Sequence, residues 1–436
     1  MNNDLVNFLS NIRDQSVYVR FNPEVFDFTN KESINEIQLY LQDGKSISFS
    51  LNDQNLPFII SILKISLFAK GMKILAWDWK NLCSFVLAKT GKVYSVDGSI
   101  IDLKIIESYS GNKQKSPNNL NDALIRLKRI ISDGTWKEIE KVYKNLHIPL
   151  FTTVIPHLEN SGIINVLSGS KVHAFYEIDG QENGRLRCFN AFKNGFVPHA
   201  MKPELKENLK PRSFEELFLV FDFRAMEVFM LSWLSKDPLL QDLCQSSDIY
   251  YSLYDKLMGC PPKEKKDREI VKKMFLPVIY GQSSYALGQQ CNIPKDVAQS
   301  IVDRINSLFP VALKWIKTQQ EQLQNLGFAK DVFGKRRKFN ENKDYLVRNF
   351  SIQSPAAVLC LEKLNHLYFA LHGKADLAYT VHDGYAVYAN KNNWEQIYDI
   401  GKEVLSGGSE FCPDLRLKVT CRGGRNLNDL KLIKKQ

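Results

Sequence analysis

The sequence predicts a mixed α/β (α+β) protein, and three patterns along the chain support this fold class. Short runs of β-forming residues alternate with helical patterns over residues 1–110. Helical periodicity then dominates residues 224–326, and two apolar runs that flank His382-Asp383 predict a hairpin near the end of the chain. With 436 residues, the chain is long enough for two or three domains.

The first 110 residues predict short strands with intervening helices. We expect strands at 16–19, 46–51, 74–77, 85–88 and 92–95, and helices near 56–69 and 101–110. The polar segment GNKQKSPNNLND at 111–122 predicts a linker, and helical periodicity follows over 123–146. After the helical region at 224–326 we expect a hairpin-like segment at 327–339, a helix at 344–371, and paired strands at 377–380 and 384–389.

Composition limits the classes of protein to which the chain can belong. Lys and Arg number 58 against 48 for Asp and Glu, which suits a polyanionic partner without requiring one. The eight cysteines are scattered with no CxxC, so we expect reduced thiols and no structural zinc. No apolar run approaches the roughly 18 residues of a membrane span, and the first residues do not resemble a signal peptide. We therefore expect a soluble, intracellular protein that is neither secreted nor membrane-bound.

Two aspartates lie in apolar, β-rich runs about 160 residues apart. Asp222 lies in LFLVFDFRAMEVFMLSWL and Asp383 in LAYTVHDGYAVYA. A carboxylate is a poor choice for the core of a sheet and a good ligand for a divalent metal. A single Asp at a strand end is usually a turn or cap residue, so the pair gains weight only from its surroundings.

A helix between the two aspartates carries cations and an aromatic residue on one face. Arg268, Lys272, Leu276 and Tyr280 recur at about one helical turn in DREIVKKMFLPVIYG. The cations at one end of this face could hold triphosphate oxygens, while the other end stacks on a base. An ordinary amphipathic helix with solvated basic residues is the alternative interpretation.

These segments resemble, in order, the motifs of family A DNA polymerases, the DNA polymerase I type. Asp222 and Glu227 match the first palm motif, in which a Glu follows an Asp by five residues. The fingers pattern R-x3-K-x7-YG matches the helix that ends at Tyr280-Gly281, and VHDG matches the strand that carries HDE. The segments NGRL, SDIYYSLYDKLMG and RNFSIQSPAA resemble three further motifs and add Arg185, Tyr250, Asn349 and Gln353. The matches extend from about residue 146 to the C-terminus.

The resemblance implies a role for each matching residue. Asp222 and Asp383 would bind two Mg²⁺ ions, for which Mn²⁺ can substitute. Glu227 would be the steric gate that favours deoxynucleotides. The remaining nucleotide-binding positions would be Arg268, Lys272 and Tyr250 at the triphosphate, Tyr280 at the base, and Leu276 where the family places an aromatic wall beside the sugar. Primer and template would contact Arg185, Asn349, Gln353 and His382.

The resemblance also implies a domain organisation. Residues 1–115 would form a degenerate 3′ to 5′ exonuclease-like domain with an RNase H-like fold, 116–148 a helical linker, and 149–436 the polymerase domain. The palm, with an antiparallel sheet, would comprise 149–235 and 327–436, and helical fingers would comprise about 236–326. Arg185 follows Pro149 by only 36 positions, where the family inserts its thumb, so we expect a minimal or absent thumb.

Several departures from the family pattern bear on activity. Gly384 stands where the family has Glu, and Arg224 replaces a small residue close to Asp222. The exonuclease motif D-x-E is replaced by Arg20 and Asn22, and Leu82 stands at the second acidic position, so we expect no proofreading.

The sequence thus predicts a template-directed DNA polymerase with low processivity. Its partners would be primer-template DNA, deoxynucleoside triphosphates, and the N-terminal domain or another protein in place of the thumb. The alternative is a catalytically idle, polymerase-like subunit that binds DNA or scaffolds a replication complex. The retained motif residues favour the enzyme, whereas Gly384 and the short thumb segment favour the scaffold. Glu227 argues against a third class, the related single-subunit RNA polymerases.

Overall fold

The computed structural model describes residues 16–22, 36–41, 43–50, 73–91, 100–112, 114–189, 196–340, 343 and 345–433. The helix expected near 56–69 and the strand expected at 92–95 lie outside these residues. Among the described helices, none has both the length and the apolar character needed to cross a membrane.

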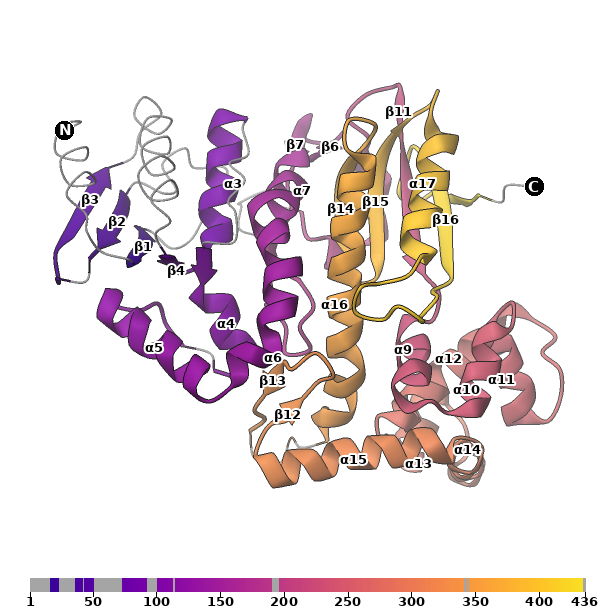
Figure 1. Ribbon diagram of the computed structural model, residues 1–436. Coiled ribbons are helices and arrows are strands. Elements are labelled where there is room, and N and C mark those ends of the chain that lie inside the picture. Colours follow the sequence, from indigo (N-terminus) through magenta and orange to yellow (C-terminus); the bar gives the residue numbers. More distant parts are fainter. Residues whose placement is uncertain are drawn as a thin grey trace.

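The N-terminal part contains a five-stranded mixed sheet (Figure 1). Its strands are β1 (Ser16–Asn22), β2 (Glu36–Tyr40), β3 (Ser46–Ser50), β4 (Lys73–Ala76) and β5 (Ile100–Asp102), in the order β3-β2-β1-β4-β5. β1, β2 and β3 pair antiparallel, whereas β4 pairs parallel with both β1 and β5. The strands predicted at 16–19, 46–51 and 74–77 are confirmed, whereas β2 was not predicted.

The strand predicted at 85–88 is wrong, because this segment belongs to helix α3 (Trp79–Thr90). Leu82, Phe85 and Val86 are buried and recur at helical spacing, so they form the inner face of a helix. A short apolar run has the same composition in a buried strand and in a buried helix, and only the longer pattern distinguishes the two.

A helical stretch connects the N-terminal sheet to the rest of the molecule. It comprises α4 (Leu103–Tyr109), α5 (Leu120–Ser132), α6 (Thr135–Val142), the π-helical turns η2 (Tyr143–His147) and η3 (Leu150–Val154), and α7 (Ile155–Ser161). The helices predicted near 101–110 and over 123–146 are confirmed. The segment predicted as a linker packs on the sheet, where the Tyr18 hydroxyl donates a hydrogen bond to the Pro117 carbonyl over 3.2 Å.

Small strands and two short helices follow α7. β6 (Ile163–Asn165), β7 (Ser170–Val172) and β10 (Leu209–Lys210) form a three-stranded sheet, and β8 (Phe175–Glu177) pairs with β9 (Arg187–Phe189). The 3₁₀ turn η4 (Pro198–Ala200) and α8 (Pro203–Asn208) lead into the central sheet.

The central sheet is antiparallel and has the order β14-β15-β11-β16-β17. Its strands are β11 (Glu216–Phe223), β14 (Asp376–Val381), β15 (Gly384–Asn390), β16 (Val419–Gly424) and β17 (Lys431–Leu432). In Figure 1, α7, the long α16 (Leu346–Leu371) and α17 (Trp394–Ser406) pack along this sheet. The predicted hairpin β14-β15 and the predicted helix at 344–371 are confirmed.

The helical region predicted at 224–326 is confirmed and lies at the lower right of Figure 1. It contains α9 (Met226–Ser235), α10 (Pro238–Gln245), α11 (Ile249–Met258), α12 (Lys265–Ile279), α13 (Ser284–Cys291), α14 (Lys295–Leu308) and α15 (Pro310–Leu326). The hairpin-like segment at 327–339 is confirmed as β12 (Ala329–Lys330) paired with β13 (Arg336–Arg337).

One hydrophobic core continues from the N-terminal sheet into the central sheet. It includes Val17 and Ile74 of the first sheet together with Phe218 and Leu364 of the second part of the molecule. A buried ion pair spans the same junction, where Lys80 Nζ of α3 lies 2.9 Å from Glu159 Oε1 of α7. The central sheet is thus held from the N-terminal side by packing and by a buried charge pair.

Candidate active site

The register of the central sheet brings Asp222 and Asp383 to the same edge. β11 pairs antiparallel with β15, so that Asp222 lies opposite Gly384, the residue that follows Asp383. The Phe223 amide donates a hydrogen bond to the Asp383 carbonyl over 3.2 Å, which ties the end of β11 to the β14-β15 turn. His382 in this two-residue turn has a φ of 52°, a conformation that a residue with a side chain adopts rarely.

Burial and a neighbouring carboxylate raise the cost of ionising Asp222. Burial, followed by the charge of Asp383, raises the pKa of Asp222 to about 6. Burial is also the main cause that raises the pKa of Asp383. The positive charges of Arg422 and Lys272 act in the opposite direction on Asp222.

The pair has the character of a site for a divalent cation. No described side chain donates a hydrogen bond to either carboxylate, so their oxygens are available as ligands. Within the described residues, no group of three or more His, Cys, Asp or Glu side chains could hold a metal. Asp222 and Asp383 are thus the two carboxylates at this edge of the sheet, and Gly384 lies opposite Asp222.

Glu227, in the first turn of α9, is the centre of a polar network that joins four predicted site residues. Arg185 Nη2 donates to Glu227 Oε1 over 2.7 Å, and the Tyr280 hydroxyl donates to Glu227 Oε2. Gln353 Nε2 of α16 lies 3.2 Å and 3.3 Å from the two carboxylate oxygens. Asn183 Nδ2 in turn donates to Gln353 Oε1 over 3.1 Å, so the network connects α9, α12, α16 and the loop before β9.

Asp248 holds two arginines near the N-terminus of α11. Its Oδ2 accepts from Arg268 Nε over 2.9 Å and from Arg224 Nη2 over 2.8 Å, while its Oδ1 caps the helix at the Tyr250 amide. The guanidinium of Arg268 lies 5.1 Å above the ring of Tyr250, which is buried. Arg268 and Tyr250, two of the predicted nucleotide-binding residues, thus lie in contact, and Arg224 joins them through Asp248.

The other two predicted residues of α12 differ in their surroundings. Lys272 is exposed and makes no ion pair with a described residue, although its charge influences Asp222. Leu276 is partly buried and packs against the core. Lys272 and Leu276 lie on the same face of α12 as Tyr280, at intervals of about one turn. Along this face, the cation is therefore farther from Tyr280 than the apolar side chain is.

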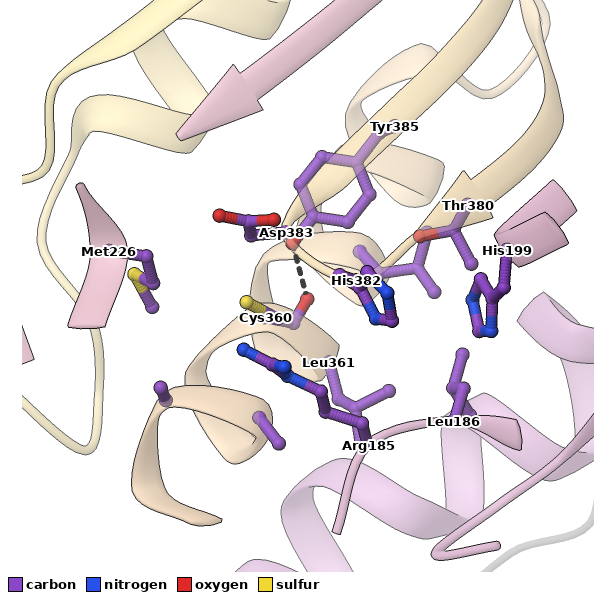
Figure 2. A pocket seen from close by; sticks show the side chains of 13 residues that line it. Arg185, Leu186, His199, Met226, Cys360, Leu361, Thr380, His382, Asp383 and Tyr385 are labelled. Carbon is purple, nitrogen blue, oxygen red and sulfur yellow. Dashed lines mark hydrogen bonds between the residues drawn. The ribbon is translucent and has the colours of Figure 1, made fainter. Parts of the chain in front are cut away.

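A pocket lies beside Asp383 (Figure 2). Figure 2 shows Arg185, His382 and Asp383 pointing toward the same space, and His382 stacks on His199 with ring centroids 4.6 Å apart. Asn349 is partly buried and lies one turn before Gln353 on α16, outside this pocket. The structure thus joins Arg185 and Gln353 through Glu227, and it places His382 at the pocket and Asn349 one turn from Gln353 on α16.

Four residues of the site were not predicted, namely Asp248, Asn183, His199 and Arg422. Asp248 and Asn183 lie within segments that the motif comparison used, and the spacing of Asp248 two residues before Tyr250 could have indicated it. His199 lies in η4, in a segment without a recognised motif, so no local pattern indicated its contact with His382.

The fold and the site together define a mixed α/β polymerase domain, and comparison with known proteins gives its family. Residues 134–429, more than half of the chain, match the model for DNA polymerase family A. The chain belongs to this family.

Curated relatives match at low identity and over part of their length. A thermostable DNA polymerase I from Thermus aquaticus is 27% identical over 218 residues, which cover 47% of this chain and 26% of that protein. A DNA polymerase I from Chloroflexus aurantiacus is 26% identical over 262 residues, which cover 56% of this chain and 27% of that protein. The chain therefore spans about a quarter of the length of these relatives.

A solved structure resembles nearly the whole fold. It is the POL domain of Pol1 from M. smegmatis in complex with DNA primer-template and dNTP, with a TM-score of 0.76. The similarity covers 98% of each chain at 14% sequence identity. At this identity the likeness concerns the fold.

Proposed function

We propose that this protein is a template-directed DNA polymerase that adds deoxynucleotides to the 3′ end of a primer. The observation that carries the proposal is the juxtaposition of Asp222 and Asp383 at one edge of the palm sheet, beside a helix that bears Arg268 and Lys272. Two neighbouring carboxylates that repel each other do not stabilise the folded protein. They do provide the oxygen ligands for the metal ions that phosphoryl transfer requires.

Two Mg²⁺ ions are the cofactors that fit these residues. Asp222 and Asp383 supply hard oxygen ligands, and neither is engaged by a described side-chain donor. When bound, such ions activate the attacking oxygen and hold the triphosphate. We propose that Mn²⁺ can replace Mg²⁺, since Mn²⁺ also prefers oxygen ligands.

The chain's own residues would bind and select the nucleotide. Lys272 and Arg268 would hold the triphosphate, and Arg268 would exchange its ion pair with Asp248 for phosphate oxygens. Glu227 is fixed by Arg185, Tyr280 and Gln353, so its carboxylate occupies one defined volume. A rigid side chain excludes an additional hydroxyl better than a mobile one, which supports a role for Glu227 as the steric gate.

We further propose low processivity and no proofreading. In the sequence between α7 and Arg185, the family has a long thumb, whereas this chain has the short hairpin β6-β7. Fewer contacts with the phosphates of duplex DNA would follow, which supports weak binding of the duplex. β1 carries Arg20 and Asn22 where an exonuclease needs acids, and Leu82 is buried in the N-terminal core. The mixed sheet of this domain supports an RNase H-like fold without its metal site.

Primer extension tests the proposal. A labelled primer-template is incubated with Mg²⁺ and all four deoxynucleotides, with wild-type protein and with Asp383→Ala. We expect extension by the wild type and none by the variant, because one carboxylate cannot hold both ions. A DNA trap added with the nucleotides should limit each binding event to short products, and a mismatched primer end should not be removed.

The same assay addresses the second candidate function, an idle polymerase-like subunit that binds DNA or scaffolds a replication complex. Gly384 in place of an acid is the observation that favours it. DNA binding without extension, with Mn²⁺ and at low salt, would support the scaffold and contradict the enzyme. Asp383→Ala should unfold at no lower temperature than the wild type and should retain its DNA binding, so that a lost activity reports on chemistry.

A further inference from the structure

Arg348, on the first turn of α16, is a partly buried cation without a partner among the described residues. Three other arginines of the site are neutralised, since Arg185 pairs with Glu227, and both Arg224 and Arg268 pair with Asp248. The side chain of Arg348 makes no ion pair or hydrogen bond with any residue that the structure describes. Burial alone lowers the pKa of Arg348, so no neighbouring charge compensates for its desolvation. A guanidinium remains charged even when it is partly buried, so binding of an anion would compensate for its desolvation.

The guanidinium lies against the end of the fingers helix. A Cβ placed on Gly281, which has a φ of 94°, would lie 2.7 Å from Arg348 Nη1 and 3.1 Å from its Cζ. The glycine therefore permits the close approach of α16 to the residue that follows Tyr280. Tyr280 itself is fixed by the Glu227 network, so Arg348 occupies a defined position beside it.

The position of Arg348 relative to the Glu227 network indicates which DNA strand, primer or template, it would contact. Arg185 and His382 line the pocket beside Asp383, where a primer end must lie for extension, and Arg348 does not line that pocket. Arg348 thus lies away from the primer side, at the joint of α12 and α16.

We propose that Arg348 binds a backbone phosphate of the template strand, next to the base that Tyr280 contacts. The inference rests on the proposed function and adds a residue to it. A phosphate would supply the anion that the described residues do not provide, through charge-assisted hydrogen bonds to the planar guanidinium. Such a contact positions the strand without reading its sequence.

Neutral phosphates at single positions test the contact. Primer-template duplexes that carry one methylphosphonate linkage, at successive positions of the template or of the primer, are bound to wild type, Arg348→Gln and Arg348→Lys without nucleotide. At one template position we expect the neutral linkage to weaken wild-type binding by about tenfold, as for a lost hydrogen bond to a charged group. Arg348→Gln should bind unmodified DNA about as weakly as the wild type binds DNA with that neutral linkage. The linkage should not weaken the variant further, because the substitution and the linkage each remove the same contact between Arg348 and the phosphate.

Two controls separate this contact from general effects of charge and folding. Lys144→Gln removes an exposed charge that pairs with Glu140, and should leave DNA binding unchanged. Arg348→Lys should recover part of the affinity, and Arg348→Gln should lower the magnitude of the slope of log affinity against log salt by about one. Since Arg348 has no described partner, neither variant should lower the unfolding temperature.

The outcomes distinguish this inference from the proposed function. If the effect of Arg348→Gln is coupled to a linkage in the primer, Arg348 does not contact the template. Additive losses of affinity at every template position would also overturn the template contact. Neither result would contradict DNA binding by the protein. A wild-type protein that extends primers but binds all methylphosphonate duplexes equally would overturn it too. A wild-type protein that binds no primer-template at low salt would overturn both proposals.

Discussion

Asp222 shows at the level of single residues how a site for chemistry differs from a site for stability. Its carboxylate lies beside Asp383 without a described hydrogen-bond donor, in a partly buried environment. The folded protein therefore holds a proton on Asp222 more tightly than the unfolded chain does. Its pKa is raised from 3.8 to about 6, so the contribution of Asp222 to stability falls as the pH rises through this window.

We predict that Asp222→Asn stabilises the metal-free protein at neutral pH. An amide of nearly the same shape removes the repulsion from Asp383, so the variant should unfold at a higher temperature than wild type at pH 7. The difference should disappear near pH 4, where Asp222 of the wild type is protonated. Thermal unfolding in EDTA, followed by circular dichroism over this pH range, measures the effect.

The control for this prediction is the same unfolding experiment with Mg²⁺ in place of EDTA. The ion should stabilise the wild type more than Asp222→Asn, because it binds the folded state and needs both carboxylates. A variant that is less stable than wild type at pH 7 in EDTA would show that Asp222 is a structural residue.

Gly384 is not required by packing. A Cβ at this position would meet Asp222 Oδ1 at 3.6 Å and two backbone oxygens at 3.4 Å, which are ordinary contact distances. Its φ does not lie in the left-handed region, so another residue would fit the backbone. The absence of an acid here is therefore a property of this sequence and not a consequence of the fold.

At the level of elements, the position of β11 depends on a close contact with α17. Gly401 of α17 lies against the ring of Phe221, the residue before Asp222, and an added Cβ would lie 2.3 Å from its Cζ. Phe221 is fully buried, so its ring has little room to move. The glycine allows the helix to approach the strand that carries the first carboxylate.

We predict that Gly401→Ala lowers both stability and polymerase activity. Alanine favours a helix over glycine by about 1 kcal/mol, but overpacking a core typically costs about 1–3 kcal/mol, and overpacking should outweigh helix propensity because the ring cannot move away. The added methyl group should also displace β11 and Asp222. Urea unfolding and primer extension measure the two effects.

A second substitution gives this prediction its control. Phe221→Leu should make room for the methyl group, so the double variant should recover part of the stability that Gly401→Ala loses. Additive losses in the double variant, or a stabilised Gly401→Ala, would contradict the contact between helix and strand.

At the level of the whole molecule, the N-terminal sheet and the polymerase part share one core. Glu159 of α7 is fully buried and accepts hydrogen bonds from Lys80 Nζ over 2.9 Å, from the Ser84 hydroxyl over 2.5 Å and from the Tyr176 amide over 2.9 Å. Lys80 also lies over the ring of Phe175. The N-terminal part therefore supports the central sheet structurally.

We predict that Lys80→Ala destabilises the whole chain by about 3–5 kcal/mol, because it leaves the charge of Glu159 buried without its partner. Circular dichroism and tryptophan fluorescence should report one common urea transition, shifted to lower urea. Lys73→Ala, which removes an exposed lysine at the start of β4, is the matched control and should have little effect. A loss below about 1 kcal/mol, or an N-terminal part that unfolds separately, would contradict the shared support.

Local patterns predicted much of the fold where an element has its own period. The amphipathic spacing of 123–146, the long apolar helix α16 and the alternating strands around His382-Asp383 were all correct. The prediction failed at 85–88, where four apolar residues have no period of their own. It also missed β2, where Ile37 and Leu39 alternate with polar residues over only five positions.

The sequence by itself determined the family, because ordered motifs carry Asp222, Glu227, the α12 cations and Asp383 over more than half of the chain. Only the tertiary structure decided which side chains touch. The Glu227 network, the two arginines on Asp248 and the approach of Arg348 to Gly281 each join segments far apart in the chain. The physical reason is that motif spacing fixes local direction along a helix or strand, whereas ion pairs and burial depend on how distant elements pack.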